Sequence, residues 1–517
     1  MVGFDITKIE NAIAKAFIAS GEIDARDVSA VSRAIGLLMM SGMPDGDVVP
    51  EVECIQDRVE SALMKAGYPK TAKSYILYRA ERSRVREMNT RLMRIYDEIT
   101  NKSAIDSDIK RENANIDGDT AMGTMLKYGS EGAKQFNELY ILDPKVSKAH
   151  IEGDIHIHDL DFLTLTTTCC QIDLLRLFEG GFSTGHGYLR EPKDIRSYSA
   201  LACIALQSNQ NDQHGGQSIP NFDYGMAPGV AKSYKKIYCQ NLGRALELLA
   251  NEECGDCVAK GILNEAIALC GEWPKLEDGE VYKAAELSLL KEKYGEEIAV
   301  KAQEFAFRRA EKEIDRATFQ AMEALVHNLN TMHSRAGAQV PFSSINYGTD
   351  TTPEGRLVIK NILKATEAGL GNGETPIFPI HIFKVKEGIN YNPGEPNYDL
   401  FKLACKVSAK RLFPNFSFID APYNLQYYKE GHPETEIAYM GCRTRVFENR
   451  YGEKTSIARG NLSFSTINSV RLAIECMNIE NKSQRIELFF AKLDELLEIT
   501  AKQLCNRYEH KNKLIQT

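Results

Sequence analysis

The sequence predicts an α/β protein built from a small helical module and a larger α/β domain. The chain has 517 residues, more than the roughly 100 to 250 that one domain usually holds, so we expect two folded units. Apolar residues recur at helical spacing near the N-terminus, and later in the chain helical segments alternate with short β-branched or aromatic runs. Hydrophobic residues make up 43% and charged residues 26%, a composition typical of folded globular proteins.

The helical module is predicted over residues 5–88. Its apolar residues follow the three- and four-residue spacing of a helix face. They are Ile9, Ile13, Ala16, Phe17, Val59, Leu63 and Met64. A loop rich in Pro, Gly and Asp interrupts them at 41–50, and a polar stretch follows the last helix. We therefore expect the module at residues 1–90, a linker at 91–118 and the large domain at 119–517.

Strong helix formers and short apolar runs define the large domain. Residues 282–332 are rich in Ala, Glu, Lys and Leu with few helix breakers, which predicts long helices. The runs Thr375–Phe383 and Phe416–Ile419 predict buried strands that end in turns. These alternating signals favour an α/β architecture.

Charge and cysteine content narrow the class of function. A net charge of −8 and a pI near 5.8 argue against a broad nucleic-acid surface, which needs clustered Lys and Arg. The N-terminal residues lack the pattern of an export signal, and no apolar run reaches the roughly 18 residues of a membrane helix. Twelve cysteines in such a chain favour reduced thiols. We expect a cytoplasmic protein with no nucleic-acid or membrane partner.

The densest set of reactive side chains lies at residues 153–174, GDIHIHDLDFLTLTTTCCQIDL. His156 and His158 with the neighbouring aspartates could bind a metal ion, but no further Cys or His pair completes a ligand set, and hydrogen-bonded histidines in a packed turn are the commoner outcome. We predict no metal site. Cys169 and Cys170 are adjacent, so in a strand their side chains point to opposite faces and only one faces a given pocket. Inert packing is the usual state of a buried cysteine.

A second candidate is Cys442, within the segment MGCRTRV at 440–446. Its glycine-containing, polar surroundings predict a loop. Positive charge on Arg443 and Arg445 would favour the thiolate, which makes a reactive cysteine plausible.

Two weaker patterns remain open. Residues 207–225 are expected to form an amide- and glycine-rich loop around His214, which suits either recognition of a polar ligand such as ribose or phosphate, or a surface loop with no ligand. Cys254 and Cys257 form a single Cys-x-x-Cys pair. Such a pair could bind zinc or cycle as a dithiol, but two free thiols on a helical turn are the favoured interpretation.

Several of these motifs, in this order, resemble the anaerobic, class III ribonucleoside-triphosphate reductase family. The resemblance covers most of residues 90–517 and is carried by HIHDLD, TTTCCQIDL, GFSTGHG, NQNDQHGGQSIP, MGCRTRV and ARGNLS. The N-terminal module resembles the ATP-cone regulatory domain of reductases, from FDITKIENAIAKAF to GYPKTAKSYILYRAERSR. The implied fold is an ATP-cone followed by a ten-stranded α/β barrel around a central finger loop, incomplete at its C-terminus.

The resemblance also implies roles for individual residues. Cys169 matches the thiol that delivers hydrogen to the 2′ side of the substrate, and Cys442 matches the transient thiyl radical that abstracts the 3′ hydrogen. Asn461 matches the asparagine near the substrate in formate-dependent members, so formate is the implied electron donor. We expect ribonucleoside triphosphates as substrates, with His158, Gln217 and Ser218 as substrate-binding candidates.

The chain departs from the family pattern at three places. Gly-Tyr pairs occur only in AGYPK and HGYLR, so the family's C-terminal glycyl-radical motif is not matched. Its four-cysteine zinc site, expected in the same missing region, is not matched either. The usual opening strand of the ATP-cone is also missing. The residues left to contact ATP or deoxynucleotide effectors are Val2, Gly3, Phe4, Asp5, Ile6, Thr7 and Lys8.

Three functional hypotheses follow from the resemblance. The first is an anaerobic reductase that acts as a homodimer with a radical-SAM activase, either truncated or split so that a second polypeptide supplies the glycyl radical. The second is a catalytically silent nucleotide-binding fragment. The third, a glycyl-radical enzyme of the formate-lyase kind, is disfavoured by the ATP-cone and the amide-rich segment.

Overall fold

The computed structural model consists of two compact units, Met1–Lys102 and Ser103–Thr517. It describes residues 5–41, 52–88, 90–102, 118–277, 279–334, 339–441, 444–446, 452 and 454–515. The α/β class and the helical N-terminal module expected from the sequence are confirmed.

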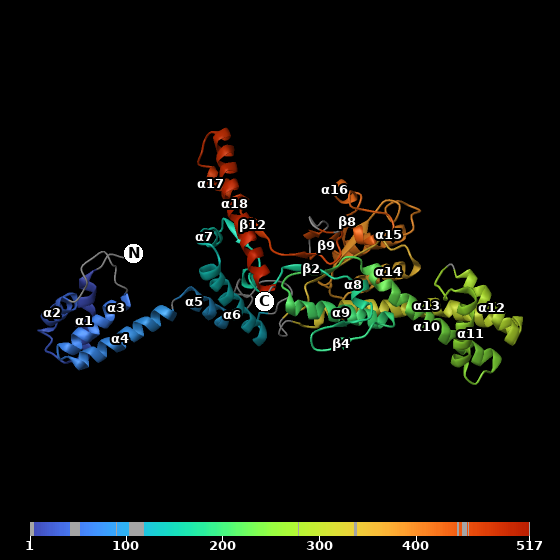
Figure 1. Ribbon diagram of the computed structural model, residues 1–517, viewed down its shortest axis with the longest axis horizontal. Helices are drawn as coiled ribbons and strands as arrows, with labels where there is room; N and C mark the ends of the chain where they lie inside the picture. Colours follow the sequence, from blue (N-terminus) through green and yellow to red (C-terminus); the bar gives the residue numbers. More distant parts are fainter. Residues whose placement is uncertain are drawn as a thin grey trace. The chain divides into compact units, whose positions relative to one another are not determined.

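The first unit is entirely helical where it is described. Its helices are α1 (Ile6–Ser20), α2 (Val28–Met40), α3 (Val52–Lys65), α4 (Pro69–Met88) and α5 (Arg91–Asn101), with α1–α4 grouped together in Figure 1. Asp5 caps α1 by accepting a hydrogen bond from Thr7 N at 3.0 Å, and Gly21 ends it in the left-handed conformation. The predicted periodic residues Ile13, Phe17 and Leu63 are fully buried in the core of this unit. The segment expected as a linker contains α5.

Helices dominate the second unit. They are α6 (Ala121–Phe136), α7 (Pro144–Glu152), α8 (Leu174–Phe178), α9 (Ile195–Asp212), α10 (Phe222–Ala250), α11 (Gly255–Cys270), α12 (Glu280–Tyr294), α13 (Glu296–Thr331), α14 (Pro353–Ala368), α15 (Tyr398–Arg411), α16 (Pro422–Leu425), α17 (Ser469–Cys476) and α18 (Lys482–Ile515). Helices α12 and α13 confirm the long helices predicted at 282–332. Within the described residues, no helix is both long and apolar enough to cross a membrane.

The strands of the second unit are short. They are β1 (Ile155–Ile157), β2 (Cys169–Gln171), β3 (Phe182–Ser183), β4 (Tyr188–Leu189), β5 (Gln217–Ile219), β6 (Ser343–Tyr347), β7 (Ile380–Val385), β8 (Asn415–Phe418), β9 (Ala438–Met440), β10 (Thr444–Val446), β11 (Gly460–Asn461) and β12 (Ser465–Ile467). The strand predicted at Thr375–Phe383 begins later, at Ile380, because Pro376 and Pro379 have no N–H to donate to a neighbouring strand.

The main sheet has six strands in the order β11-β2-β5-β6-β7-β8. Strands β2, β5, β6, β7 and β8 are parallel to one another, and β11 is antiparallel to β2. The family-type barrel would have ten strands, whereas this sheet has six among the described residues. The five parallel strands bring the segments at 169, 217 and 343 side by side, although they lie far apart in the sequence.

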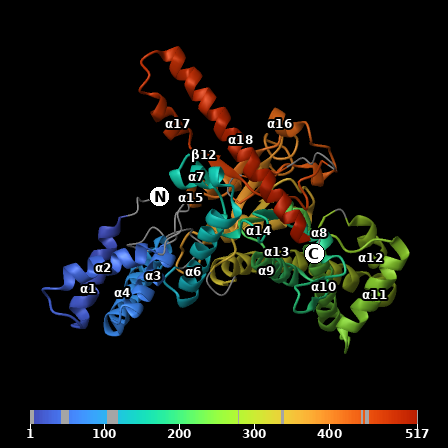
Figure 2. The ribbon, with the colours of Figure 1, turned by 60° about the vertical axis from the view of Figure 1, so that its left-hand side comes forward.

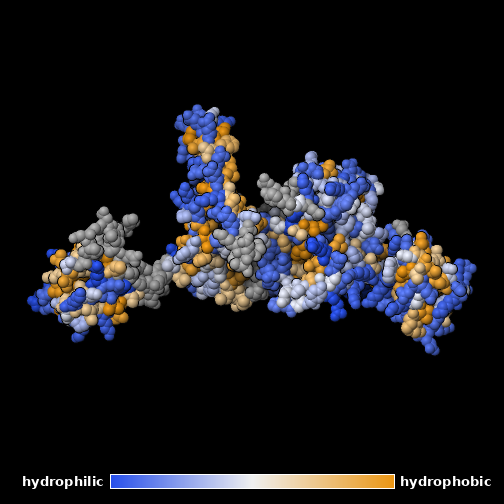
Figure 3. Space-filling view, in the orientation of Figure 1, coloured by the Kyte–Doolittle hydropathy of each residue, from blue (hydrophilic) through white to orange (hydrophobic). Residues whose placement is uncertain are grey.

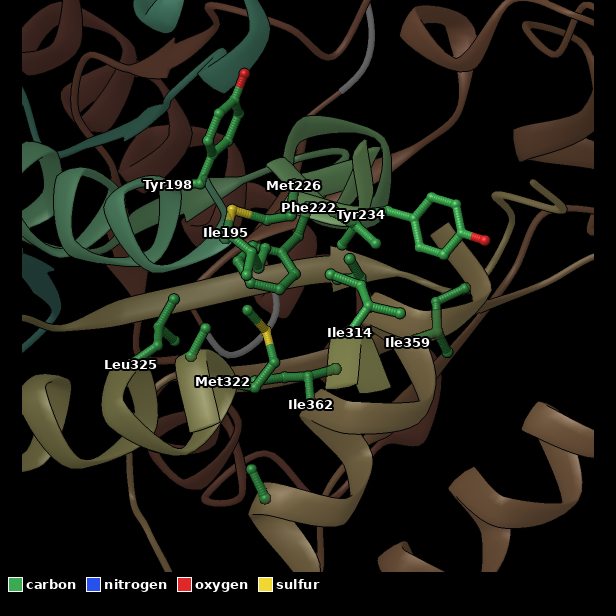
Figure 4. Packing of buried hydrophobic residues seen from close by; sticks show 14 of the residues in the cluster. Ile195, Tyr198, Phe222, Met226, Tyr234, Ile314, Met322, Leu325, Ile359 and Ile362 are labelled. Carbon is green, nitrogen blue, oxygen red and sulfur yellow. The ribbon is translucent and has the colours of Figure 1, made fainter. Parts of the chain in front are cut away.

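The sheet rests on a large helical core. Helices α9, α10, α13 and α14 contribute most of the residues shown in Figure 4, among them Phe222, Met226, Met322 and Ile362, all fully buried. Burying each such side chain contributes about 1.5 to 3 kcal/mol through the hydrophobic effect. Because the strands of the sheet pack on this helical layer, the residues at the strand ends are held in fixed positions.

Two peripheral features complete the unit. Figures 1 and 2 both show α17 folded back beside α18, and the side chains of Arg471 and Lys492 meet Glu475 at 3.0 and 2.9 Å. Hydrophobic surface gathers over the lobe formed by α11 and α12 (Figure 3), where Leu269 is exposed.

Candidate active site around Cys169

The two adjacent cysteines of β2 face opposite sides of the sheet. Cys170 faces α9, where its Sγ accepts a hydrogen bond from Asn209 Nδ2 at 3.1 Å. Burial raises the pKa of Cys170 to about 12, against the opposing effect of the Asn209 hydrogen bond. Cys169 is buried on the other face, and Gly216 N donates to its Sγ at 3.3 Å. The strand geometry therefore places Cys170 on the face of the sheet that α9 covers. Cys169 lies on the opposite face, which we call the inner face, as predicted for two adjacent cysteines in a strand.

Strand β9 is fixed over this inner face by hydrogen bonds from β5 and β6. Ser218 Oγ donates to Tyr439 O at 2.7 Å, and Asn346 Nδ2 donates to the same oxygen at 3.0 Å. Asn346 Oδ1 accepts from Tyr439 N at 2.8 Å. At the end of β9, Gly441 N donates to Ser344 Oγ at 3.1 Å. These buried contacts set the position of the chain up to Gly441.

Cys169 and Gly441 meet at Gly216. A Cβ atom on Gly216 would lie 3.2 Å from the Cα of Gly441, so the two backbones are in direct contact. The same Gly216 donates its N–H to Cys169. Cys442 and Arg443 lie outside the described residues. Arg445 contacts α16, where its Nε donates to Asn424 Oδ1 at 2.7 Å.

Asn461 lies beside Cys169. The two are direct partners in the antiparallel pairing of β11 with β2, and Thr168 N donates to Asn461 O at 2.8 Å. Directly opposed residues of an antiparallel pair project to the same face, so the Asn461 side chain shares the inner face with Cys169.

The other predicted substrate residues are placed differently. Gln217 is on the helix side of β5, with its side-chain amide 3.0 Å from Asn209 Nδ2. Ser218 is on the inner face but is fully buried beneath β9. His158 follows β1, where its Nε2 lies 2.7 Å from Thr466 Oγ1 and its ring stacks on Phe464.

The sequence interpretation missed a pair of polar side chains near Cys169, formed by Asp159 and His214. Asp159 Oδ1 lies 3.0 Å from Nε2 of His214, whose ring stacks on Phe162. Burial works to raise the pKa of Asp159, but the hydrogen bond and charge of His214, with Arg507, hold it below its usual value. His214 precedes the glycine turn that touches Cys169. Both residues belong to motifs noted in the sequence, but only the tertiary fold reveals their contact.

The segment 207–225 was expected to be a loop, and this was wrong for most of its length. Helix α9 continues to Asp212, β5 begins at Gln217, and α10 begins at Phe222. Its amides pack against neighbouring elements, as when Gln213 Nε2 donates to Thr167 Oγ1 at 2.8 Å. Amide-rich composition indicated a polar surface, whereas Gln210, Gln213 and Gln217 are buried and hydrogen-bonded within the protein.

Gly215 leaves no room for a side chain. Its φ is +83°, and a Cβ would lie 1.9 Å from Thr168 O and 3.1 Å from Cys169 Sγ. We expect Gly215→Ala to lower the free energy of unfolding by about 3 kcal/mol or more, because strain and overlap add. Gly185→Ala is the control: its φ is +86° with no atom within 4 Å, so a loss of only about 1 kcal/mol is expected. Equal losses in urea unfolding would contradict the close packing at Gly215.

Behind β9 lies a buried cluster of charged side chains. Lys384 Nζ lies 2.8 Å from Glu436 Oε2, and both groups are almost fully buried. Asp223 Oδ2 accepts backbone hydrogen bonds from Gly348, Thr349 and Asp350 at 2.8, 3.1 and 3.1 Å. Burial raises the pKa of Glu436, against the opposing charge of Lys384. Because Glu436 directly precedes the segment that enters β9, the cluster anchors the base of that strand.

Asp350 makes this cluster sensitive to pH. Burial and the neighbouring Asp223 carboxylate raise the pKa of Asp350 to about 7. Its usual value is about 3.9, so between these pH values the folded state binds more protons than the unfolded state, and stability falls as pH rises. We expect Asp350→Asn to exceed the wild type in free energy of unfolding by about 2 to 4 kcal/mol at pH 8 and to match it near pH 4. Urea unfolding across this range tests it, and parallel curves for the two proteins would rule it out.

The effector-binding prediction covers N-terminal residues that the structure describes only in part. Val2, Gly3 and Phe4 lie outside the described residues, and Asp5 to Lys8 form the start of α1. The rings of His156 and His158 lie 4.6 Å apart, and among the residues that the structure describes no three His, Cys, Asp or Glu side chains are grouped to bind a metal ion.

The structure joins Cys254 and Cys257 in a disulfide bond at the start of α11, so the expectation of two free thiols was wrong for this pair. Their close spacing on one turn permits the bond.

Similar proteins match the chain across both units. A family model described as the ATP cone domain matches residues 1–84. Anaerobic ribonucleoside-triphosphate reductases of Salmonella typhimurium and Escherichia coli are each 29% identical over 514 residues. That match takes in 98% of this chain and 61% of each relative, so the chain spans about three fifths of the length of these proteins.

A solved structure is also similar. The anaerobic ribonucleotide reductase from Thermotoga maritima with MES in the active site matches with a TM-score of 0.46 at 14% identity, covering 92% of this chain and 64% of that one. A second family model, described as anaerobic ribonucleoside-triphosphate reductase, matches residues 112–517. Because this model spans well over half of the sequence, the chain belongs to the anaerobic ribonucleoside-triphosphate reductase family.

Proposed function

We propose that this chain carries the thiol chemistry that reduces ribonucleoside triphosphates to 2′-deoxyribonucleoside triphosphates. The observation that carries the proposal is the contact at Gly216, which bonds to Cys169 Sγ and packs against Gly441. Consecutive Cα atoms are ~3.8 Å apart, so Cys442 is tethered within one residue of this contact. In this proposal, two cysteines that are far apart in the sequence react with the same sugar.

The proposed roles form a balanced reaction. Cys442, as a thiyl radical, takes the hydrogen atom from C3′ and becomes a thiol. The 2′-hydroxyl leaves as water after gaining a proton, Cys169 supplies hydrogen to C2′, and the hydrogen held by Cys442 returns to C3′. Formate restores the hydrogen of the Cys169 thiol, supplies the remaining electron to the sugar and leaves as carbon dioxide, so each turnover consumes one formate and one proton and releases one water. Asn461 shares the inner face with Cys169, where its amide can bind formate or the sugar.

We propose that the radical source is a glycine on a polypeptide segment other than residues 1–517. A glycyl radical would supply the acceptor for the hydrogen atom of the Cys442 thiol. We propose that a radical-SAM activase generates it, that the enzyme is a homodimer, and that ATP or deoxynucleotide effectors bind the N-terminal unit at Asp5 to Lys8. A zinc site would accompany the glycine segment.

Anaerobic reconstitution tests the proposal. The chain is mixed with a polypeptide that carries an Arg-x-x-Gly-Tyr segment and a cysteine quartet, together with the activase, ATP and formate. Formation of deoxynucleotide and carbon dioxide in equal amounts is expected, and omission of formate should stop both. If nucleotides bind but no deoxynucleotide forms, the silent nucleotide-binding hypothesis replaces this one.

A further inference from the structure

Gln171 is a buried polar side chain on the inner face that the proposed reaction does not use. It lies two residues after Cys169 on β2, so both side chains project to the same face. Its partner in the parallel pairing with β5 is Ser218, whose hydroxyl also points inward to β9. The residue is 5% exposed, and neither Oε1 nor Nε2 makes a hydrogen bond.

An unpaired buried amide destabilises the folded protein when no ligand is bound. Most buried polar side chains have a hydrogen-bond partner, and leaving donor and acceptor unpaired forfeits the hydration that both had in the unfolded chain. Two neighbouring polar groups on this face are already used, because Ser218 Oγ and Asn346 Nδ2 both donate to Tyr439 O. The backbone N–H of Gln171 donates to Arg459 O at 2.7 Å, so only the side chain is unpaired.

The chemistry of the amide selects the ligand. Phosphate and formate only accept hydrogen bonds, so they would leave Oε1 unpaired, whereas a hydroxyl both donates and accepts. Residues two apart on a strand are separated by roughly 6.6 Å, about the span of a sugar ring with its substituents. A ribose whose C2′ faces Cys169 is therefore long enough to reach Gln171.

We propose that Gln171 hydrogen-bonds the 2′-hydroxyl of the nucleotide's ribose and so positions the sugar against Cys169. The inference rests on the proposed function and adds a residue that distinguishes ribose from deoxyribose. It makes Gln171 a substrate-binding residue, whose amide is satisfied only when substrate is bound.

Calorimetric binding of a ribonucleoside triphosphate and of its 2′-deoxy counterpart to the full chain tests the inference without turnover. The wild type should bind the ribonucleotide more tightly. In Gln171→Met, which keeps the length but removes the amide, we expect the ribonucleotide Kd to rise about ten-fold and the deoxynucleotide Kd to change little. In the reconstituted enzyme, the same variant should raise KM more than it lowers kcat.

Thermal unfolding provides a readout that is independent of nucleotide. Gln171→Met should raise Tm, because an unpaired amide is replaced by an apolar side chain. Gln210→Met is the matched control: Gln210 is equally buried, but its amide donates to Val340 O and accepts from Ser334 Oγ at 3.2 and 2.6 Å. That variant should lower Tm, because both partners lose a hydrogen bond.

The outcomes separate this inference from the proposed function. A wild type that distinguishes the two nucleotides while Gln171→Met does so equally well overturns the role of Gln171 alone. A fall in Tm for Gln171→Met, like that of the control, also overturns it, since the amide would then be satisfied within the protein. A wild type that binds neither nucleotide overturns both proposals.

Discussion

Replacing Cys442 with serine is expected to reduce deoxynucleotide formation by more than about 10³-fold in the reconstituted system. The hydroxyl of serine cannot take over the hydrogen-atom chemistry of a thiol, so the first step at C3′ has no acceptor. Nucleotide binding should be unchanged, because the substitution only replaces one sulfur atom by oxygen. Product formation and nucleotide Kd, measured on the same preparation, test both halves of this prediction.

The control for this variant is Cys405→Ser on α15. Cys405 is an exposed free cysteine outside the main sheet, and partial burial raises its pKa. We expect activity close to that of the wild type. Measurable product from Cys442→Ser would mean that another thiol starts the reaction. Loss of activity in both variants would indicate general damage to the fold.

Local patterns predicted the elements that depend on nearby residues. Helical spacing identified the buried side chains Ile13, Phe17 and Leu63 of the first unit, and the breaker-free run at 282–332 identified α12 and α13. The strand at 416–419 appeared one residue earlier, as β8. Alternation along a strand also separated Cys169 from Cys170 before any tertiary contact was known.

Contacts between distant segments could not be read from the sequence. Strand β6, with the polar sequence SSINY, has no apolar alternation, yet its Ser344 and Asn346 hold β9 in place. The carboxylates of Asp223 and Asp350 come together only when β5 and β6 pair. Polar side chains are mostly exposed in proteins, but hydrogen bonds across the sheet allow these residues to be buried. The role of Gly216 is a further example, because it depends on contacts with both Cys169 and Gly441.

The two cysteines of β2 should differ sharply when each is replaced by alanine. Cys169→Ala is expected to abolish deoxynucleotide formation, because the inner face then has no thiol to supply hydrogen at C2′. Cys170→Ala should keep most of the activity, because Cys170 faces α9 and its Sγ only accepts a hydrogen bond from Asn209. It should lower the free energy of unfolding by about 1 kcal/mol, the typical effect of a lost hydrogen bond. Product formation and urea unfolding measure the two effects.

Alkylation tests the burial of Cys170 without turnover. Thiolates react with iodoacetamide and thiols do not, so the pKa of about 12 that burial gives Cys170 should leave it unmodified at pH 8 in the folded chain. Unfolding should expose both cysteines to the reagent, as mass spectrometry of the β2 peptide would show. If Cys170→Ala abolishes turnover while Cys169→Ala retains it, the assignment of faces is reversed, and the contact of Gly216 with Cys169 no longer locates the active thiol. If both variants remain active, the hydrogen delivered to C2′ comes from neither residue of this strand.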